Sequence, residues 1–141
     1  MIKPADLLPI IQCEAPDFDP ALILGFVQTE SSFNERAFRI DRNGGSYGLM
    51  QLDLSTARDR GYPGDAFGLY DPKTNIHYGV AQLRWINRYL ASYSAVGLQS
   101  MIAAYNEGVG RVVKGNPDPR YVASVIASRD RFRAILHEGV A

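Results

Sequence analysis

Glu30 is the residue whose type and position most clearly suggest chemistry. Ile23, Phe26, Val27 and Glu30 follow the spacing of one helical face, so the acid lies on an apolar stripe. Burial disfavours the charged carboxylate and raises its pKa, and the negative end of the helix dipole acts in the same direction. A carboxyl group that stays protonated near neutral pH is suited to general acid catalysis.

Asp41 and Asp53 are the other carboxylates of interest. Asp41 begins the polar run 41–45, which is rich in turn residues, and Asp53 follows an apolar run and can cap a short helix. Glycoside cleavage needs one acid with a raised pKa, together with a second carboxylate or the N-acetyl group of the substrate. The spacing leaves Glu30 as either a catalytic acid or a structural glutamate, and the two aspartates as either turn and cap residues or participants in the reaction.

The composition argues against several other kinds of function. The chain has 141 residues, with 15 basic and 15 acidic side chains, so it lacks the basic field of a nucleic-acid-binding protein. Cys13 is its single cysteine, and His77 and His137 are isolated, so we expect no metal site and no cofactor. No apolar run is long enough to span a membrane. The length indicates one domain over residues 1–141, and we expect a monomer.

The elements that must position these carboxylates are mostly helical. Apolar periodicity, Asp-Pro helix starts and Gly or Pro stops predict helices over 5–14, 20–31, 72–92, 98–106, 109–114 and 120–137. A short helix that Asp53 or Ser55 can cap is predicted to run through Arg60. Between the second and third helices, the turn residues 41–45 and the flanking Phe38, Ile40, Tyr47 and Leu49 predict a short hairpin. Gly79 would cost its helix about 1 kcal/mol relative to Ala, which indicates close packing there. The predicted fold class is mainly α, with at most one small β-hairpin.

Four motifs follow one another along the chain. They are Glu30-Ser31-Ser32-Phe33-Asn34, Gly48-Leu49-Met50-Gln51, Asp71-Pro72 with Asn75-Ile76 and Gly79, and Ala104-Tyr105-Asn106 with Gly108 and Gly110. In this order they resemble the lysozyme-like lytic transglycosylases that act on peptidoglycan, a family related to goose-type lysozyme. Tyr121 resembles the tyrosine that opens the last helix of that family. The resemblance implies a lysozyme-like helical domain.

The resemblance also implies roles for individual residues. Glu30 would be the sole catalytic acid and base, and Tyr105 would donate a hydrogen bond that orients it. Substrate-binding roles would fall to Ser31, Met50, Gln51, Asn106 and Tyr121. Two of these residues have alternatives: Ser31 can instead terminate its helix, and Gln51 can instead pair with the loop backbone.

The implied reaction is cleavage of the β-1,4 bond between N-acetylmuramic acid and N-acetylglucosamine. In the transglycosylase route Glu30 acts as acid and then as base, which yields a 1,6-anhydromuramoyl product. The run from Asp41 to Asp53 also resembles goose-type lysozyme, a muramidase in which aspartates activate water. We prefer the transglycosylase, because a polar loop before Gly48 also occurs in that group. A non-catalytic glycan-binding or structural module is the third and most distant alternative.

The route to the cell wall is a separate expectation. The apolar run at the N-terminus is broken by Pro4, Asp6 and Pro9, so it does not form an adequate signal peptide. Because the implied substrate lies in the bacterial periplasm or outside the cell, we expect delivery by a phage, as an endolysin or virion enzyme, or by a secretion machine.

Overall fold

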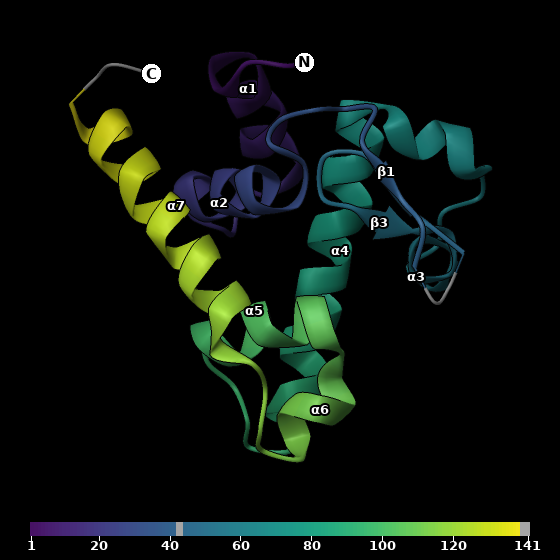
Figure 1. Cartoon of the computed structure of the whole chain (residues 1–141), viewed down its shortest axis with the longest axis vertical. Helices are drawn as coiled ribbons and strands as arrows, with labels where there is room; N and C mark the ends of the chain where they lie inside the picture. The colour runs from purple at the N-terminus through teal and green to yellow at the C-terminus, as the bar shows by residue number, and fades with distance from the viewer. Residues whose placement is uncertain (42–43, 139–141) are drawn as a thin grey trace.

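The computed structural model describes residues 1–41 and 44–138, and it shows a helical body with a small sheet beside it (Figure 1). The helices are α1 (Pro4–Glu14), α2 (Pro20–Ser31), α3 (Leu54–Asp59), α4 (Pro72–Ala91), α5 (Leu98–Glu107), α6 (Val109–Val113) and α7 (Pro119–His137), with a 3₁₀ helix η1 over Ala66–Tyr70. The predicted mainly α fold is confirmed. Arg42 and Asn43, in the predicted turn, lie outside the described residues.

Three of the helices begin at the Asp-Pro pairs seen in the sequence. Asp19, Asp71 and Asp118 each accept a hydrogen bond from a backbone N–H of the first turn of α2, α4 and α7, respectively. Such caps satisfy donors that have no partner within the helix, and proline at the first position already has the helical φ. Within the described part of the chain, no helix is both long and apolar enough to cross a membrane.

The sheet has one strand more than the hairpin that we expected. Strands β1 (Phe38–Arg39), β2 (Ser46–Tyr47) and β3 (Leu52–Asp53) pair antiparallel in the order β1-β2-β3. Arg39 pairs with Ser46, and Ser46 pairs with Asp53, so these three side chains form one cross-strand row. Because neighbouring side chains on a strand point to opposite faces, the sheet has a polar row on one face and an apolar row on the other. The apolar row consists of Phe38, Tyr47 and Leu52.

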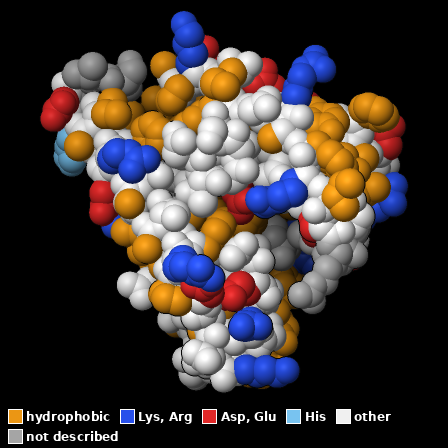
Figure 2. All heavy atoms as spheres, viewed as in Figure 1, with side chains coloured by type: hydrophobic (Ala, Val, Ile, Leu, Met, Phe, Trp, Pro, Cys, Tyr) orange, Lys and Arg blue, Asp and Glu red, His pale blue; other side chains and the backbone are white. Residues whose placement is uncertain are grey.

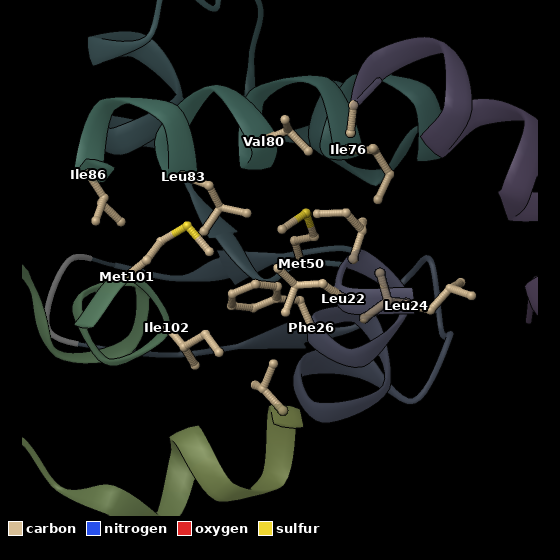
Figure 3. Close-up of a cluster of buried hydrophobic side chains, with 14 of the residues drawn as sticks. Leu22, Leu24, Phe26, Met50, Ile76, Val80, Leu83, Ile86, Met101 and Ile102 are labelled. Carbon is tan, nitrogen blue, oxygen red and sulfur yellow. The ribbon is translucent and has the colours of Figure 1, made fainter. Parts of the chain in front are cut away.

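Met50 connects the loop between β2 and β3 to the main core. Its side chain is fully buried and lies between α4 residues above it and Leu22 and Phe26 of α2 below it (Figure 3). A Cβ atom built on Gly79 would lie 2.5 Å from the Met50 sulfur, so only glycine leaves room for this side chain. The close packing predicted at Gly79 is confirmed.

Asn75 holds the same loop by its side-chain amide. The residue is fully buried on α4, and its Oδ1 accepts a hydrogen bond from the Met50 N–H at 2.8 Å. Its Nδ2 donates to the carbonyl oxygens of Tyr47 and Leu69, both at 2.8 Å. Asn75 thereby binds three backbone groups, which fixes the position of the loop that follows β2.

Candidate active site

A polar cleft lies where α2, α5 and the polar row of the sheet meet. It has a volume of about 280 Å³ and is lined by Glu30, Arg39, Asp41, Ser46, Gln51, Asp53, Tyr105 and Asn106. In the space-filling view the molecule is hollowed between the long helices and the sheet, and acidic and basic side chains meet beside the hollow (Figure 2). The cleft therefore collects most of the residues that the sequence singled out.

Glu30 reaches the cleft from the last turn of α2. This helix packs closely against α7, which lies beside it in Figure 1. A Cβ atom on Gly25 would lie only 2.8 Å from the Val125 carbonyl oxygen, so the missing side chain allows the two helices to approach. The approach brings Tyr121, near the start of α7, next to Glu30.

The Glu30 carboxyl has one partner on each oxygen. Its side chain is 8% exposed, and Oε2 accepts a hydrogen bond from the Tyr121 hydroxyl at 2.5 Å. Oε1 lies 3.6 Å from Nη2 of Arg39. Burial raises the pKa of Glu30 above its ordinary value, and this effect exceeds the lowering by the Tyr121 hydrogen bond and the Arg39 charge. The carboxyl group is therefore biased toward its protonated form.

Tyr105 does not make the hydrogen bond that we expected from it. Its hydroxyl donates to the Met50 carbonyl oxygen at 2.8 Å, and its ring packs against Phe26 at a centroid distance of 5.2 Å. The prediction that Tyr105 donates to Glu30 is therefore wrong, because its single hydroxyl proton is held by the loop backbone. Tyr121 makes that bond instead. Burial, and then the charge of Glu30, raise the pKa of both tyrosines well above the usual value, so both remain donors.

The polar row of the sheet forms one wall of the cleft. Ser46 donates from its hydroxyl to Oδ2 of Asp41 at 2.5 Å. Asp53 accepts the Thr56 N–H at 2.7 Å through Oδ1, which caps α3 as the sequence predicted. Arg39 and Ser46 were not predicted as site residues from the sequence. The signal that would have found them is the pairing of β1 with β2, which places both on the face that carries Asp53.

Gln51 combines the two roles that we considered for it. Its Nε2 donates to the carbonyl oxygens of Ala37 and Gly48, both at 3.1 Å, so the amide nitrogen pairs with loop backbone. The residue also lines the cleft. The amide oxygen is the atom through which Gln51 can still bind a ligand.

Three expected substrate-binding residues do not line the cleft: Met50, Ser31 and Tyr121. Met50 is fully buried in the core, so the prediction that its side chain lines the sugar groove is wrong. Its side chain packs instead into the space that Gly79 leaves on α4. Ser31 donates from Oγ to the Val27 carbonyl oxygen at 3.1 Å, in the last turn of α2. This contact supports helix termination over substrate binding for Ser31.

For Asn106 and Tyr121, substrate binding stays a prediction. Asn106 is exposed at the end of α5 and lines the cleft, where its amide can reach a ligand. Tyr121 is already the partner of Glu30. Among the described residues, no group of three or more His, Cys, Asp or Glu side chains is placed to hold a metal ion.

Comparison with protein families matches residues 9–120 to the transglycosylase SLT domain. Curated relatives include a protein named membrane-bound lytic murein transglycosylase C from Haemophilus influenzae, 36% identical over 126 residues, which are 80% of this chain and 34% of that protein. A protein of the same name from Mannheimia succiniciproducens is 40% identical over 121 residues, which are 77% of this chain and 32% of that protein. The chain thus spans about a third of the length of these relatives.

Solved structures support the fold. The 70 kDa soluble lytic transglycosylase from Escherichia coli superposes with a TM-score of 0.60 at 23% identity, covering 86% of this chain and 21% of that chain. An inactive mutant of the lytic transglycosylase Slt from Pseudomonas aeruginosa gives a TM-score of 0.60 at 24% identity, covering 89% of this chain and 21% of that chain. The predicted lysozyme-like helical fold is confirmed by these matches.

Proposed function

The chain belongs to the transglycosylase SLT domain family, and we propose that it cleaves the glycan strands of peptidoglycan as a lytic transglycosylase. The observation that carries this proposal is the environment of Glu30. The carboxyl is nearly buried, biased toward protonation and held by Tyr121 at the edge of a polar cleft. Glu30 and all residues that line the cleft lie within the matched segment 9–120.

In the first step Glu30 acts as the general acid. Its proton passes to the oxygen of the β-1,4 bond between N-acetylmuramic acid and N-acetylglucosamine. The bond from C1 to that oxygen breaks, and the electron pair leaves with the oxygen. The carbonyl oxygen of the substrate's own N-acetyl group stabilises the positive charge that develops at C1, so no second carboxylate is required.

In the second step the same residue acts as the base. The Glu30 carboxylate removes the proton from the C6 hydroxyl of the muramoyl unit, and O6 forms a bond to C1. This closes a 1,6-anhydro ring, consumes no water and returns Glu30 to its protonated form. Between the steps, the Tyr121 hydroxyl stabilises the carboxylate through the bond to Oε2.

The alternative is a muramidase in which Asp41 or Asp53 activates water. Both line the cleft, but each has a local structural partner: Asp41 accepts from Ser46, and Asp53 caps α3. These contacts account for the two aspartates without a role in the reaction. They support the anhydro route over hydrolysis.

The experiment is digestion of purified peptidoglycan sacculi, followed by turbidity and by mass spectrometry of the products. We expect clearing by the wild type, 1,6-anhydromuramoyl ends, and loss of clearing in Glu30→Gln. Glu14→Gln is the matched control, because Glu14 lies outside the cleft, near His77. Undiminished clearing by Glu30→Gln would contradict the proposal, and reducing ends that carry one added water would assign the muramidase reaction instead.

The proposal extends to the setting of the enzyme. Because the substrate is peptidoglycan, we place its action at the bacterial cell wall, with residues 1–141 acting as one monomeric catalytic domain. A phage lysis apparatus or a secretion machine is the proposed means of delivery. Lysis of intact expressing cells that requires a co-expressed holin supports the phage route, whereas lysis of those cells without a holin contradicts it. Light scattering during gel filtration tests the monomer.

A further inference from the structure

We propose that Arg39 is a positioning residue for Glu30, whose guanidinium offsets the negative charge that Glu30 acquires after it gives up its proton. This inference rests on the proposed function and deepens it. An ion pair spans the cleft, in which Nη2 of Arg39 lies 3.6 Å from Oε1 of Glu30. The opposite oxygen, Oε2, is held by Tyr121, so the two partners fix the carboxyl from both sides.

The backbone of Arg39 is held in place independently of Glu30. Arg39 pairs with Ser46 across β1 and β2, and Phe38 on the opposite face packs against Tyr47 at a centroid distance of 5.1 Å. A strand anchored in this way directs the Arg39 side chain toward the cleft. The Arg39 side chain is 67% exposed, so it has room to adjust as the charge state of the Glu30 carboxyl changes.

Arg39 supplies the positive charge in a cleft whose other described side chains are acidic or neutral. Among the described residues that line it, three carry carboxyl groups and Arg39 alone carries a permanent positive charge. The groups that face Glu30 are Tyr121 from α7, Tyr105 from α5, Arg39 from β1, Asp41 from the loop after β1 and Asp53 from β3. Of these, the tyrosines are neutral and the aspartates carry no positive charge that could offset a Glu30 carboxylate. Arg39 is the group that compensates this carboxylate electrostatically.

A solvent-exposed arginine usually contributes little to stability, because water screens its charge. Here the partner is 8% exposed, so its carboxylate has lost most of its hydration and depends more on nearby charges. Loss of the Arg39 charge should make Glu30 a weaker acid in the first step. We expect kcat to fall about tenfold, which corresponds to about 1.4 kcal/mol of barrier height.

The test compares Arg39→Gln with Arg39→Lys, which keeps the charge. The control is Arg36→Gln, because Arg36 is exposed in the segment between α2 and β1 and does not line the cleft. Each variant is assayed for anhydro product formation across pH. In parallel, the Glu30 carboxyl is titrated by ¹³C NMR in glutamate-labelled protein without substrate, with Glu30→Gln used to assign its resonance. The titration needs no turnover, so it tests Arg39 even if the proposed reaction fails.

Activity in the first step requires protonated Glu30, so it declines as pH rises through the pKa of that group. Because the Arg39 charge lowers this pKa, Arg39→Gln should move the alkaline limb and the NMR midpoint to higher pH. In Arg39→Lys the alkaline limb and the NMR midpoint should stay close to those of the wild type, and in Arg36→Gln they should equal them. An unmoved midpoint in Arg39→Gln, or equal effects of Arg39→Gln and Arg39→Lys, would overturn the inference.

Discussion

Removing the Tyr121 hydroxyl tests the arrangement around Glu30 most directly. In Tyr121→Phe, Oε2 of Glu30 loses the bond that it accepts at 2.5 Å, while the ring is retained. A hydrogen bond to a charged group contributes about 1.5–3 kcal/mol and a neutral one about 0.5–1.5 kcal/mol. Only the difference of about 1–1.5 kcal/mol bears on the step that makes Glu30 anionic. We therefore expect kcat to fall about five- to tenfold.

Tyr105→Phe is the matched control, because it removes the other hydroxyl near the acid. Tyr105 donates to the Met50 carbonyl, so its loss leaves a largely buried acceptor unpaired. This should lower the free energy of unfolding by about 1–3 kcal/mol, and each kcal/mol lost should lower Tm by about 2–4 °C. The effect on kcat should be smaller than in Tyr121→Phe.

The assay measures kcat and KM for anhydro product release across pH, with thermal melting of both variants. The Tyr121 bond lowers the pKa of Glu30, so Tyr121→Phe should also move the alkaline limb of kcat/KM to higher pH. The reverse pattern would refute the reasoning. In that case Tyr105→Phe would lower kcat and move the limb, while Tyr121→Phe would only melt earlier.

Three further predictions concern the surroundings of the site. Glu30→Gln should raise Tm near neutral pH but not at pH 4. In the wild type, stability falls as pH rises from the ordinary Glu pKa of 4.5 through the raised pKa of Glu30 in the folded state, and the substitution removes this loss. A lower Tm of the variant at neutral pH would contradict this. Gly79→Ala should destabilise the protein by about 1–3 kcal/mol, although alanine has the better helix propensity. Adding Met50→Ala should relieve part of that cost, as measured by thermal melting of the double mutant. Strictly additive effects of the two substitutions on stability would contradict this. Asp53→Asn should keep the α3 cap, with Tm changed by less than about 2 °C and anhydro products unchanged by mass spectrometry; a switch in product would assign Asp53 to the reaction.

The sequence was sufficient for the helices and for the burial of Glu30 because both depend on local pattern. Asp-Pro starts and apolar periodicity located the helices, and the apolar stripe predicted that the Glu30 side chain is buried. The partner of Glu30 depends on contacts across 91 positions of the chain, and local pattern does not determine which of two tyrosines reaches it. Arg39 was missed for a related reason, since its place in the cleft follows from strand register.

Two glycines show how this site depends on backbone approach more than on the reactive side chains alone. Gly25 allows α7 to approach α2, and that approach sets the position of Tyr121 relative to Glu30. Gly79 admits the Met50 side chain to the core and so fixes the carbonyl that accepts from Tyr105. A side chain at either position would leave Glu30 in the sequence but displace the groups around it. The surroundings of Glu30 therefore depend on close backbone approach, and a sequence that kept Glu30 but carried a side chain at Gly25 should lose the close contact with Tyr121.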